Sequence, residues 1–324
     1  MCEGTFIISL DFELLWGLSG WNQSQIESYR SHVEGSLSAL KRILEVLARF
    51  DMKCSIAFVG GMNYRSTDEL NNVAPELHPQ YTTSVFSSYE SLIPNIDKLY
   101  PNNLFFCKDV ITELSKNPKV ELASHTFSHY YCLEKGQSSQ EFEADICTAV
   151  NEAKNSGISF KTIIFPRNQV SIDYLNICSE YGLTHYRGNL ETFLYRSEHT
   201  PKKFSLRRVL RLLDAYVNLS GHNTYMQPKK EGQMINVPGS RFLRPYSRSL
   251  AFLEPLKVKR ILDSIEYAAK HSQIYHLWWH PHNFGLHIEE NINQLEKICE
   301  CYQAMHRQYG MECKFISENN SIRL

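Results

Sequence analysis

Two acidic residues follow the first apolar segment of the chain. Asp11 and Glu13 come directly after the apolar run Phe6–Leu10 and are separated by one residue. In an extended segment, side chains two positions apart point to the same side. Carboxylates on one face can ligate a metal ion or accept a proton, so this pair is a candidate for either role.

Two histidines four residues apart form the second candidate group. His125 and His129 follow the apolar run Val120–Ala123, and a helical turn would bring their imidazoles together. The chain contains 13 histidines, and His276 and His280 share this spacing, so the spacing alone is a weak signal. Two histidines with one carboxylate, and coordination positions left open for water and substrate, form a hydrolytic zinc site.

Polar residues also follow two later apolar runs. Arg167 comes after Thr162–Phe165, and His280 comes after Ile274–Trp278. A guanidinium can hold a carboxylate ionised, and an imidazole titrates in the range that suits a general acid. Four separate segments thus supply acids, histidines and a guanidinium, and their combination carries the hypothesis of a metal-dependent hydrolase.

The elements that must position these residues alternate between strands and helices. The predicted strands are Phe6–Leu10, Cys54–Val59, Val120–Ala123, Thr162–Phe165, Leu183–Tyr186, Met234–Val237 and Ile274–Trp278. The predicted helices lie around Leu37–Leu47, Val110–Leu114, Phe142–Ala153, Tyr174–Tyr181, Val258–Ala269 and Ile288–His306. This alternation favours an α/β fold with parallel strands, and at this length a (β/α) barrel. The candidate residues then meet at one rim, because barrel active sites lie at the carboxyl ends of the strands.

Two long stretches do not follow this alternation. We expect residues 1–324 to form a single barrel domain with insertions around 62–103 and 189–245. The first stretch is rich in Asn, Ser, Thr, Pro and Tyr, and the second is rich in basic and aromatic residues. Long excursions of this kind commonly carry binding function.

Composition excludes several classes of protein. Lys and Arg number 34 and Asp and Glu 35, a formal net charge of −1, which argues against a nucleic-acid partner. The 9 cysteines form no regular framework and are expected as thiols. The first residues do not resemble a signal peptide, and no apolar run approaches the ~18 residues that a membrane span needs. We therefore expect a cytoplasmic protein that is not an integral membrane protein; its oligomeric state stays open.

Four motifs resemble a known family. The segments 9–13 (SLDFE), 124–129 (SHTFSH), 165–167 (FPR) and 280–281 (HP) look like the ordered motifs of the polysaccharide deacetylases, carbohydrate esterase family 4. The His-rich segment after a strand is the most specific of them. The resemblance implies a distorted (β/α) barrel of seven or eight strands. It also implies metal-dependent removal of an N-acyl group, usually acetyl, from an amino sugar.

The resemblance also implies roles for individual residues. Asp11 matches the family's catalytic base, Arg167 the arginine that orients the base, and His280 the general acid. His125 and His129 match its metal-binding histidines. Where many members have two adjacent aspartates, this chain has Asp11-Phe12-Glu13, so we assign Glu13 as the metal ligand, although the two acids can be exchanged. The third motif reads Phe-Pro-Arg-Asn in place of Arg-x-Pro-Tyr, so the register of Arg167 is not fixed.

Further residues near the motifs are candidates for substrate binding. Aromatic rings can cover the apolar faces of sugars, and guanidinium groups suit phosphate or carboxylate. Strand alternation favours Trp278 as a core residue. The candidates are Trp16, Asn168, Arg207, Arg208, Arg241, Trp279 and His282.

The arginines favour a phosphorylated or nucleotide-linked sugar. The absence of a signal-peptide pattern favours a building block, either a nucleotide sugar or a lipid-linked saccharide. The resemblance to similar intracellular proteins implies the surface-polysaccharide pathways (O-antigen or capsule). Zinc is the expected cofactor, and cobalt or nickel would fit the same ligands. Three alternatives stay open. The enzyme could remove a formyl or other acyl group or open a small cyclic amide. It could be a glycoside hydrolase, which needs two carboxylates that flank the scissile bond. It could also be an inactive barrel that only binds a glycan.

Overall fold

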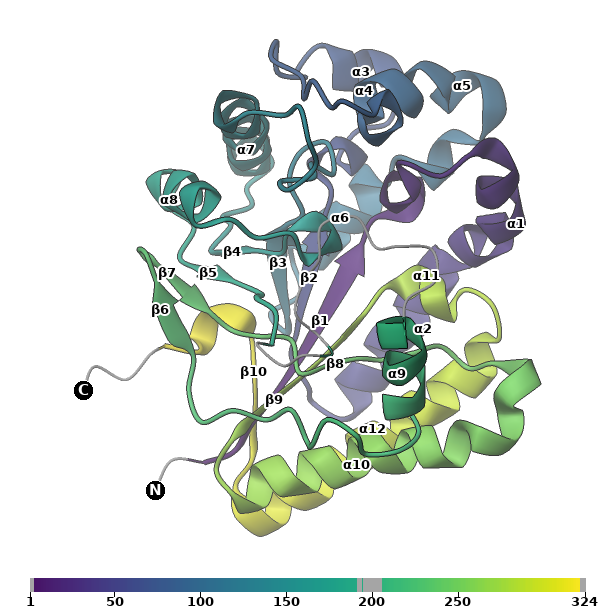
Figure 1. The fold of residues 1–324 in the computed structure, drawn as a ribbon, viewed down its shortest axis with the longest axis vertical. Helices are drawn as coiled ribbons and strands as arrows, with labels where there is room; N and C mark the ends of the chain where they lie inside the picture. The colour runs from purple at the N-terminus through teal and green to yellow at the C-terminus, as the bar shows by residue number, and fades with distance from the viewer. Residues whose placement is uncertain (1–2, 191–193, 195–205, 321–324) are drawn as a thin grey trace.

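A curled, mostly parallel sheet forms the centre of the molecule (Figure 1). The computed structural model describes residues 3–190, 194 and 206–320, without the side chains of residues 97, 99 and 206–208. The ten strands of the sheet are β1 (Thr5–Phe12), β2 (Cys54–Phe58), β3 (Val120–Ser124), β4 (Thr162–Ile163), β5 (His185–Tyr186), β6 (Lys229–Glu231), β7 (Met234–Asn236), β8 (Arg241–Phe242), β9 (Ile274–Trp279) and β10 (Glu312–Lys314).

The strand order shows how the sheet closes on itself. Strands β1 to β5 lie side by side in sequence order, and β9 pairs with the free side of β1. The segment 234–242, which contains β7 and β8, bridges β5 and β9, the two outer strands of this set. Its Val237 amide donates to Tyr186 of β5, and its Ser240 amide donates to His276 of β9. The predicted distorted (β/α) barrel is confirmed.

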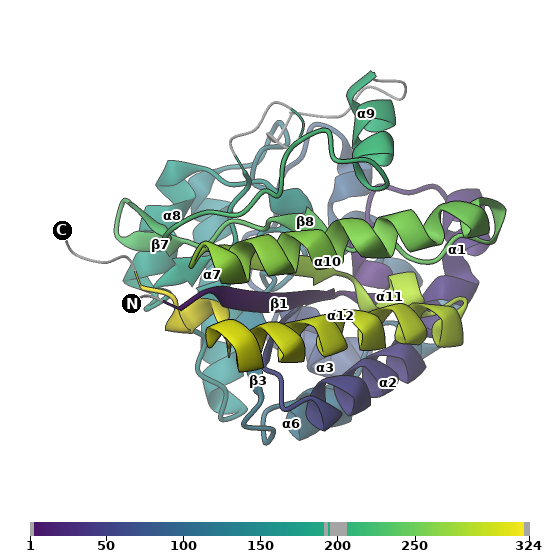
Figure 2. The ribbon, with the colours of Figure 1, turned by 90° about the horizontal axis from the view of Figure 1, so that it is seen from below.

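Helices cover the outside of the curled sheet. They are α1 (Gln23–Glu34), α2 (Ser36–Arg49), α3 (Thr67–Asn71), α4 (Ser88–Ser91), α5 (Ile96–Leu99), α6 (Lys108–Leu114), α7 (Ser139–Asn155), α8 (Ile172–Glu180), α9 (Leu206–Asp214), α10 (Glu254–Lys270), α11 (Pro281–Phe284) and α12 (Ile288–Tyr309). Helix α12 packs between α10 and α2, and Figure 2 shows α10 and α12 flanking β1. The six helices predicted from the sequence are all present within a few residues of their expected bounds.

The alternation of side chains along β1 separates two apolar layers. Phe6, Ile8 and Leu10 belong to the large core between sheet and helices, whereas Ile7 belongs to a small cluster with residues of the other strands. That small cluster fills the barrel interior: Ile7, Ala57, Ala123, Ile164, Val237, Ile274 and Ile316. Ser9 and Asp11 continue the inward side of β1 above it, so Asp11 stands at the carboxyl end of the barrel.

The stretch 62–103 contains short helices α3 to α5 and 3₁₀ turns, with no strand among its residues, all of which have a described backbone. Within 189–245, strands β7 and β8 are part of the barrel wall. That both stretches are insertions in a single barrel domain stays a proposal. Among the described residues, no helix is both long and apolar enough to cross a membrane.

Candidate active site

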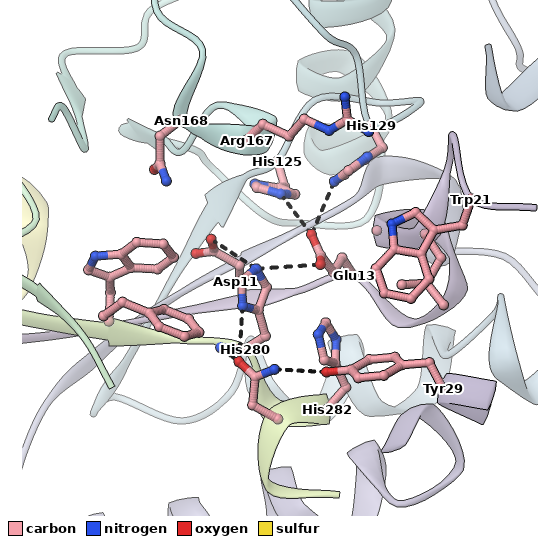
Figure 3. Close-up of a pocket in the computed structure, with 15 residues that line it drawn as sticks. Asp11, Glu13, Trp21, Tyr29, His125, His129, Arg167, Asn168, His280 and His282 are labelled. Carbon is pink, nitrogen blue, oxygen red and sulfur yellow. Dashed lines mark hydrogen bonds and ion pairs between the residues drawn. The ribbon is translucent and has the colours of Figure 1, made fainter. Parts of the chain in front are cut away.

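Glu13 and the two histidines of the 124–129 segment meet in the barrel mouth (Figure 3). Glu13 follows the end of β1, and its Oε2 lies 3.0 Å from Nε2 of His129 and 3.3 Å from Nε2 of His125. All three side chains are buried. One ligand atom from each lies within 4.8 Å of the others, and they form the one such group found among the described residues.

The turn that carries the histidines is held by a buried carboxylate. Asp145 of α7 accepts hydrogen bonds from the amides of Phe127 (2.7 Å) and Ser128 (3.0 Å) and from the Ser128 hydroxyl. Burial raises the pKa of Asp145 to about 6, and these hydrogen bonds oppose the rise. Thr126 and His129 have positive φ angles of 64° and 61°, so this segment is not a turn of α-helix. The predicted helical placement of the pair is therefore wrong, although the two rings do meet, with centroids 5.1 Å apart.

A glycine makes room for the Glu13 carboxylate. A Cβ at Gly17 would lie 2.1 Å from Oε1 of Glu13. Any side chain at position 17 would therefore displace the carboxylate from the histidines.

The three residues fit a divalent metal. Nδ1 of His125 donates to the carbonyl of Ile164 at 2.7 Å, which leaves the lone pair of Nε2 directed toward Glu13. Burial lowers the pKa of His129 to about 4, so that this imidazole is neutral, as a ligand must be. Burial would raise the pKa of Glu13, but His280, His125 and His129 lower it well below its usual value. Two imidazoles and one carboxylate are a donor set typical of catalytic zinc.

Asp11 is paired with an arginine that the sequence analysis did not single out. Both oxygens of Asp11 accept hydrogen bonds of 2.6 Å from Arg187, which follows β5. Both residues are buried. Burial would raise the pKa of Asp11, but the Arg187 guanidinium outweighs it and holds that pKa below the usual value. Asn168 and Ser9 also accept hydrogen bonds from Arg187, and the ring of Trp278 lies 4.1 Å from its guanidinium.

The prediction that Arg167 orients Asp11 is wrong. Arg167 has a positive φ of 55°, and its guanidinium points away from Asp11 toward Glu134 (3.3 Å) and the Ser19 carbonyl (3.2 Å). It also lies over the ring of Tyr131, 4.0 Å from the centroid. Arg167 still lines the pocket, where it is available to a substrate.

His280 stands on the other side of the two acids. Its Nε2 lies 3.4 Å from Oε1 of Glu13 and 3.7 Å from Oδ2 of Asp11. Its Nδ1 donates to Oδ1 of Asn283 at 3.2 Å, and Asn283 donates to the Tyr29 hydroxyl at 3.0 Å. This arrangement fixes Nε2 as the nitrogen that exchanges a proton with the pocket.

A pocket of about 320 Å³ opens over these groups. Phe242 and Trp278 form an aromatic wall against His280, with ring centroids 5.8 and 5.9 Å from it. His282 is buried, stacks on His280, and has a pKa lowered to about 3 by burial and by its neighbour. The lining residues are Asp11, Glu13, Gly17, Leu18, Trp21, Tyr29, His125, His129, Arg167, Asn168, Phe242, Trp278, His280, His282 and Asn283.

Two tryptophans predicted to bind substrate lie elsewhere. Trp16 is fully buried, and its Nε1 donates to the Phe105 carbonyl at 3.0 Å. Trp279 is fully buried and stacks on Phe284 in the outer core. The predicted alternation of β9 was thus inverted, because Trp278 faces the pocket.

The predicted arginine cluster divides into separate environments. Arg241 is buried, and its Nη1 lies 3.2 Å from Oδ2 of Asp214. It does not line the pocket, so its predicted role in substrate binding is wrong. Arg207 and Arg208 belong to α9, but their side chains lie outside the described part of the chain. Their assignment stays a prediction.

Several residues of the site were missed by the sequence analysis. Arg187 directly follows a predicted strand, so the rule that located the other groups could also have found it. Phe242 likewise ends β8, although that strand is only two residues long. Tyr29 and Asn283 lie in helices α1 and α11, and no spacing pattern connects them with the motifs.

Removal of the carboxylate that holds the histidine turn is expected to weaken both the fold and the metal site. Asp145→Ala leaves two buried amides and one hydroxyl without an acceptor, so the free energy of unfolding should fall by about 3 kcal/mol. Thermal denaturation and zinc titration would measure the two effects. Asp109→Ala, at an exposed ion pair with Arg65, is the matched control and should change neither. Unchanged zinc affinity in Asp145→Ala would contradict the positioning role.

A family model matches the middle of the chain. Residues 34–186 match the family model described as polysaccharide deacetylase. The matched range contains His125, His129 and Arg167, whereas Asp11, Glu13, Arg187 and His280 lie outside it. No curated protein matches the chain.

Solved structures share the fold at low sequence identity. A structure from Mycobacterium smegmatis, assigned as a polysaccharide deacetylase, has a TM-score of 0.57 and 10% identity, over 99% of this chain and 95% of the other. Puue allantoinase has a TM-score of 0.56 and 10% identity, over 97% and 88%. The 4-alpha-glucanotransferase of Thermococcus litoralis has a TM-score of 0.54 and 15% sequence identity, and the match covers 98% of this chain and 40% of the other. At these identities the likeness concerns the fold alone.

Proposed function

We propose that this chain, which carries a polysaccharide deacetylase domain, is a metal-dependent hydrolase that removes an N-acyl group from an amino sugar. The observation that carries the proposal is that a candidate metal site and a candidate acid–base pair lie in one pocket. Glu13, His125 and His129 form a candidate metal site, and Asp11 and His280 stand beside it. An acetyl group is the expected acyl group.

The proposed metal ligands are Glu13, His125 and His129. A divalent metal held there, with zinc as the default and cobalt or nickel as alternatives, would supply Lewis-acid polarisation of an acyl carbonyl and a lowered pKa for a water molecule. Asp11 is the better candidate for the base, because it contacts neither histidine of the pair within hydrogen-bond distance and is held by Arg187. These contacts favour Glu13 over Asp11 as the ligand.

The protein's own groups would move the protons. Asp11 is ionised by its pairing with Arg187 and can accept the proton of the attacking water. His280 can then donate a proton from Nε2 to the departing amine, which leaves readily only when protonated. Asn283 keeps the imidazole in the orientation that this transfer needs. Arg187 acts through Asp11 and is a positioning residue.

The pocket walls suit a sugar. Trp278 and Phe242 present aromatic faces beside His280, and Trp21 lies on the side of Glu13 (Figure 3). Aromatic faces of this kind pack against the C–H faces of sugars, while Arg167 and Asn168 supply polar atoms. We further propose a nucleotide-linked or lipid-linked amino sugar of surface-polysaccharide biosynthesis as the substrate, and a cytoplasmic location.

The fold leaves one alternative reaction open. Puue allantoinase shares the fold about as well as the M. smegmatis structure assigned as a polysaccharide deacetylase, so the fold does not decide between removal of an acyl group and opening of a small cyclic amide. A glycoside hydrolase is less well supported, because Glu13 is engaged with two histidines and does not stand free opposite Asp11.

An assay of acyl release tests the proposed function. Protein would be stripped with a chelator and then reconstituted with zinc. The substrates to be tested are N-acetylglucosamine, nucleoside-diphosphate-linked N-acetylglucosamine, N-acetylated chitooligosaccharides, an N-formyl amino sugar and allantoin. We expect zinc-dependent release of acetate from one acetylated sugar class, and none from allantoin. Asp11→Asn is the inactive control. Zinc-dependent opening of allantoin, or zinc binding without hydrolysis of any of these, would contradict the proposal.

A further inference from the structure

Helix α9 is oriented with its apolar side toward solvent. Its residues Val209, Leu212 and Leu213 are 42%, 39% and 48% exposed, and Val217 and Leu219 just after it are 55% and 50% exposed. Surface helices normally bury their apolar side and expose the polar one. We call these five residues the α9 apolar face.

Two polar residues of α9, Arg211 and Asp214, bind the body of the protein. Asp214 is fully buried and accepts hydrogen bonds from the Leu219 and Ser220 amides at 3.0 and 2.8 Å. It also pairs with Arg241, whose Nη1 lies 3.2 Å away. Arg211 donates to the carbonyl of Leu194. These contacts fix the orientation of the helix, so its exposed apolar side is a property of the fold.

The helix stands at the active-site end of the barrel. Arg241, which binds Asp214, directly precedes Phe242 of the pocket wall. Figure 1 draws α9 below the arrowhead of β1, and Figure 2 shows it projecting beyond α10, on the side away from β1. Because Arg241 holds the end of α9 next to Phe242, a surface that contacted the α9 apolar face would lie near the pocket wall.

The basic sequence next to α9 indicates what binds the α9 apolar face. The sequence from 202 to 208, which leads into α9, contains Lys202, Lys203, Arg207 and Arg208 and no acidic residue. Two copies of such a segment would repel each other, whereas an anionic surface would attract it. Basic residues combined with an exposed apolar helix side are typical of helices that lie in the membrane interface.

We propose that α9 docks this enzyme on an anionic lipid surface, with its apolar face inserted among the lipids and the pocket held next to the membrane. The proposal goes beyond the deacetylase function and does not depend on it. It adds a reason to favour a lipid-linked substrate, because a docked enzyme meets substrates that the membrane presents.

Vesicle co-sedimentation tests the docking without metal or substrate. The wild type would be mixed with vesicles of phosphatidylcholine alone and of phosphatidylcholine with phosphatidylglycerol in equal amounts. We expect binding to the anionic vesicles that weakens with added salt, and about tenfold weaker binding for Leu212→Ser/Leu213→Ser. The matched control Leu77→Ser/Ile172→Ser replaces two exposed residues far along the chain from α9, 54% and 66% exposed, and should bind like the wild type.

Other outcomes would overturn the proposal. Wild-type protein that stays in the supernatant, binds neutral vesicles equally well, or binds no better than Leu212→Ser/Leu213→Ser would show that α9 is not an anionic-lipid anchor. Sedimentation velocity without lipid gives a further check. A wild-type dimer that the double substitution converts to a monomer would assign the face to a second copy of the chain. Acyl release from a water-soluble substrate should be the same in all three proteins, so a failed docking test is distinguishable from a failed deacetylase assay.

Discussion

The substitution Glu13→Gln is expected to abolish metal binding, whereas Asp11→Asn should keep the metal and lose the reaction. Glu13 contacts both histidines, so its loss removes a direct ligand and should lower zinc affinity by more than about 100-fold. Asp11 contacts Arg187, so Asp11→Asn should lower kcat by about 10²–10⁴-fold, the range of a general base. Zinc titration and steady-state kinetics measure the two effects.

This pair of variants separates the two carboxylates, which the motif alone leaves interchangeable. Both changes replace one carboxylate oxygen with an amide nitrogen and keep the side-chain size, so the two variants are a matched pair. Thermal denaturation of both apo proteins serves as the control for folding. Loss of zinc in Asp11→Asn together with zinc retention in Glu13→Gln would show that the two roles are exchanged.

Replacement of Arg187 is expected to have the second-largest effect. Arg187→Met leaves the Asp11 carboxylate buried and without its cation, which should destabilise the fold by about 3–5 kcal/mol. Where the protein still folds, kcat should fall by about 100-fold or more, because the base is no longer held in place. Denaturant unfolding and the kinetics of the metal-loaded variant measure these effects.

Two further variants keep this prediction falsifiable if Arg187→Met does not fold. Asp11→Asn/Arg187→Met removes both charges, so it should recover part of the lost stability and show a favourable coupling in a double-mutant cycle. Arg167→Met replaces a partly exposed arginine of the same pocket and should lose less stability than Arg187→Met, with its kinetic effect mainly in KM. A greater loss of kcat in Arg167→Met than in Arg187→Met would restore the assignment made from the motif.

The sequence predicted the parts of the site that depend on local order. Glu13 and His125 follow strand ends, and parallel strands bring their carboxyl ends to one rim whatever the details of the packing. That rule also located His280. The conformation of the histidine turn depends instead on Asp145, which lies on α7 and binds the turn only in the folded protein. Its role is therefore invisible in the sequence.

The errors of the sequence analysis come from long-range geometry. The resemblance directed attention to Arg167, but β5 carries Arg187 across the barrel to Asp11. Trp278 and Trp279 were exchanged because both sides of a barrel strand are apolar at this end, so alternation alone does not fix which side faces inward. The orientation of α9 depends likewise on the buried contacts of Asp214 and on no pattern within the helix itself.

The most direct test of the central claim is a crystal structure of the zinc-reconstituted protein with data collected at the zinc absorption edge. We expect a single anomalous peak in the pocket, about 2.0–2.2 Å from Nε2 of His125, Nε2 of His129 and a carboxylate oxygen of Glu13. The Asp11 carboxylate should remain paired with Arg187. Absence of a peak at these residues in zinc-saturated crystals would contradict the account of this protein as a metal-dependent deacylase.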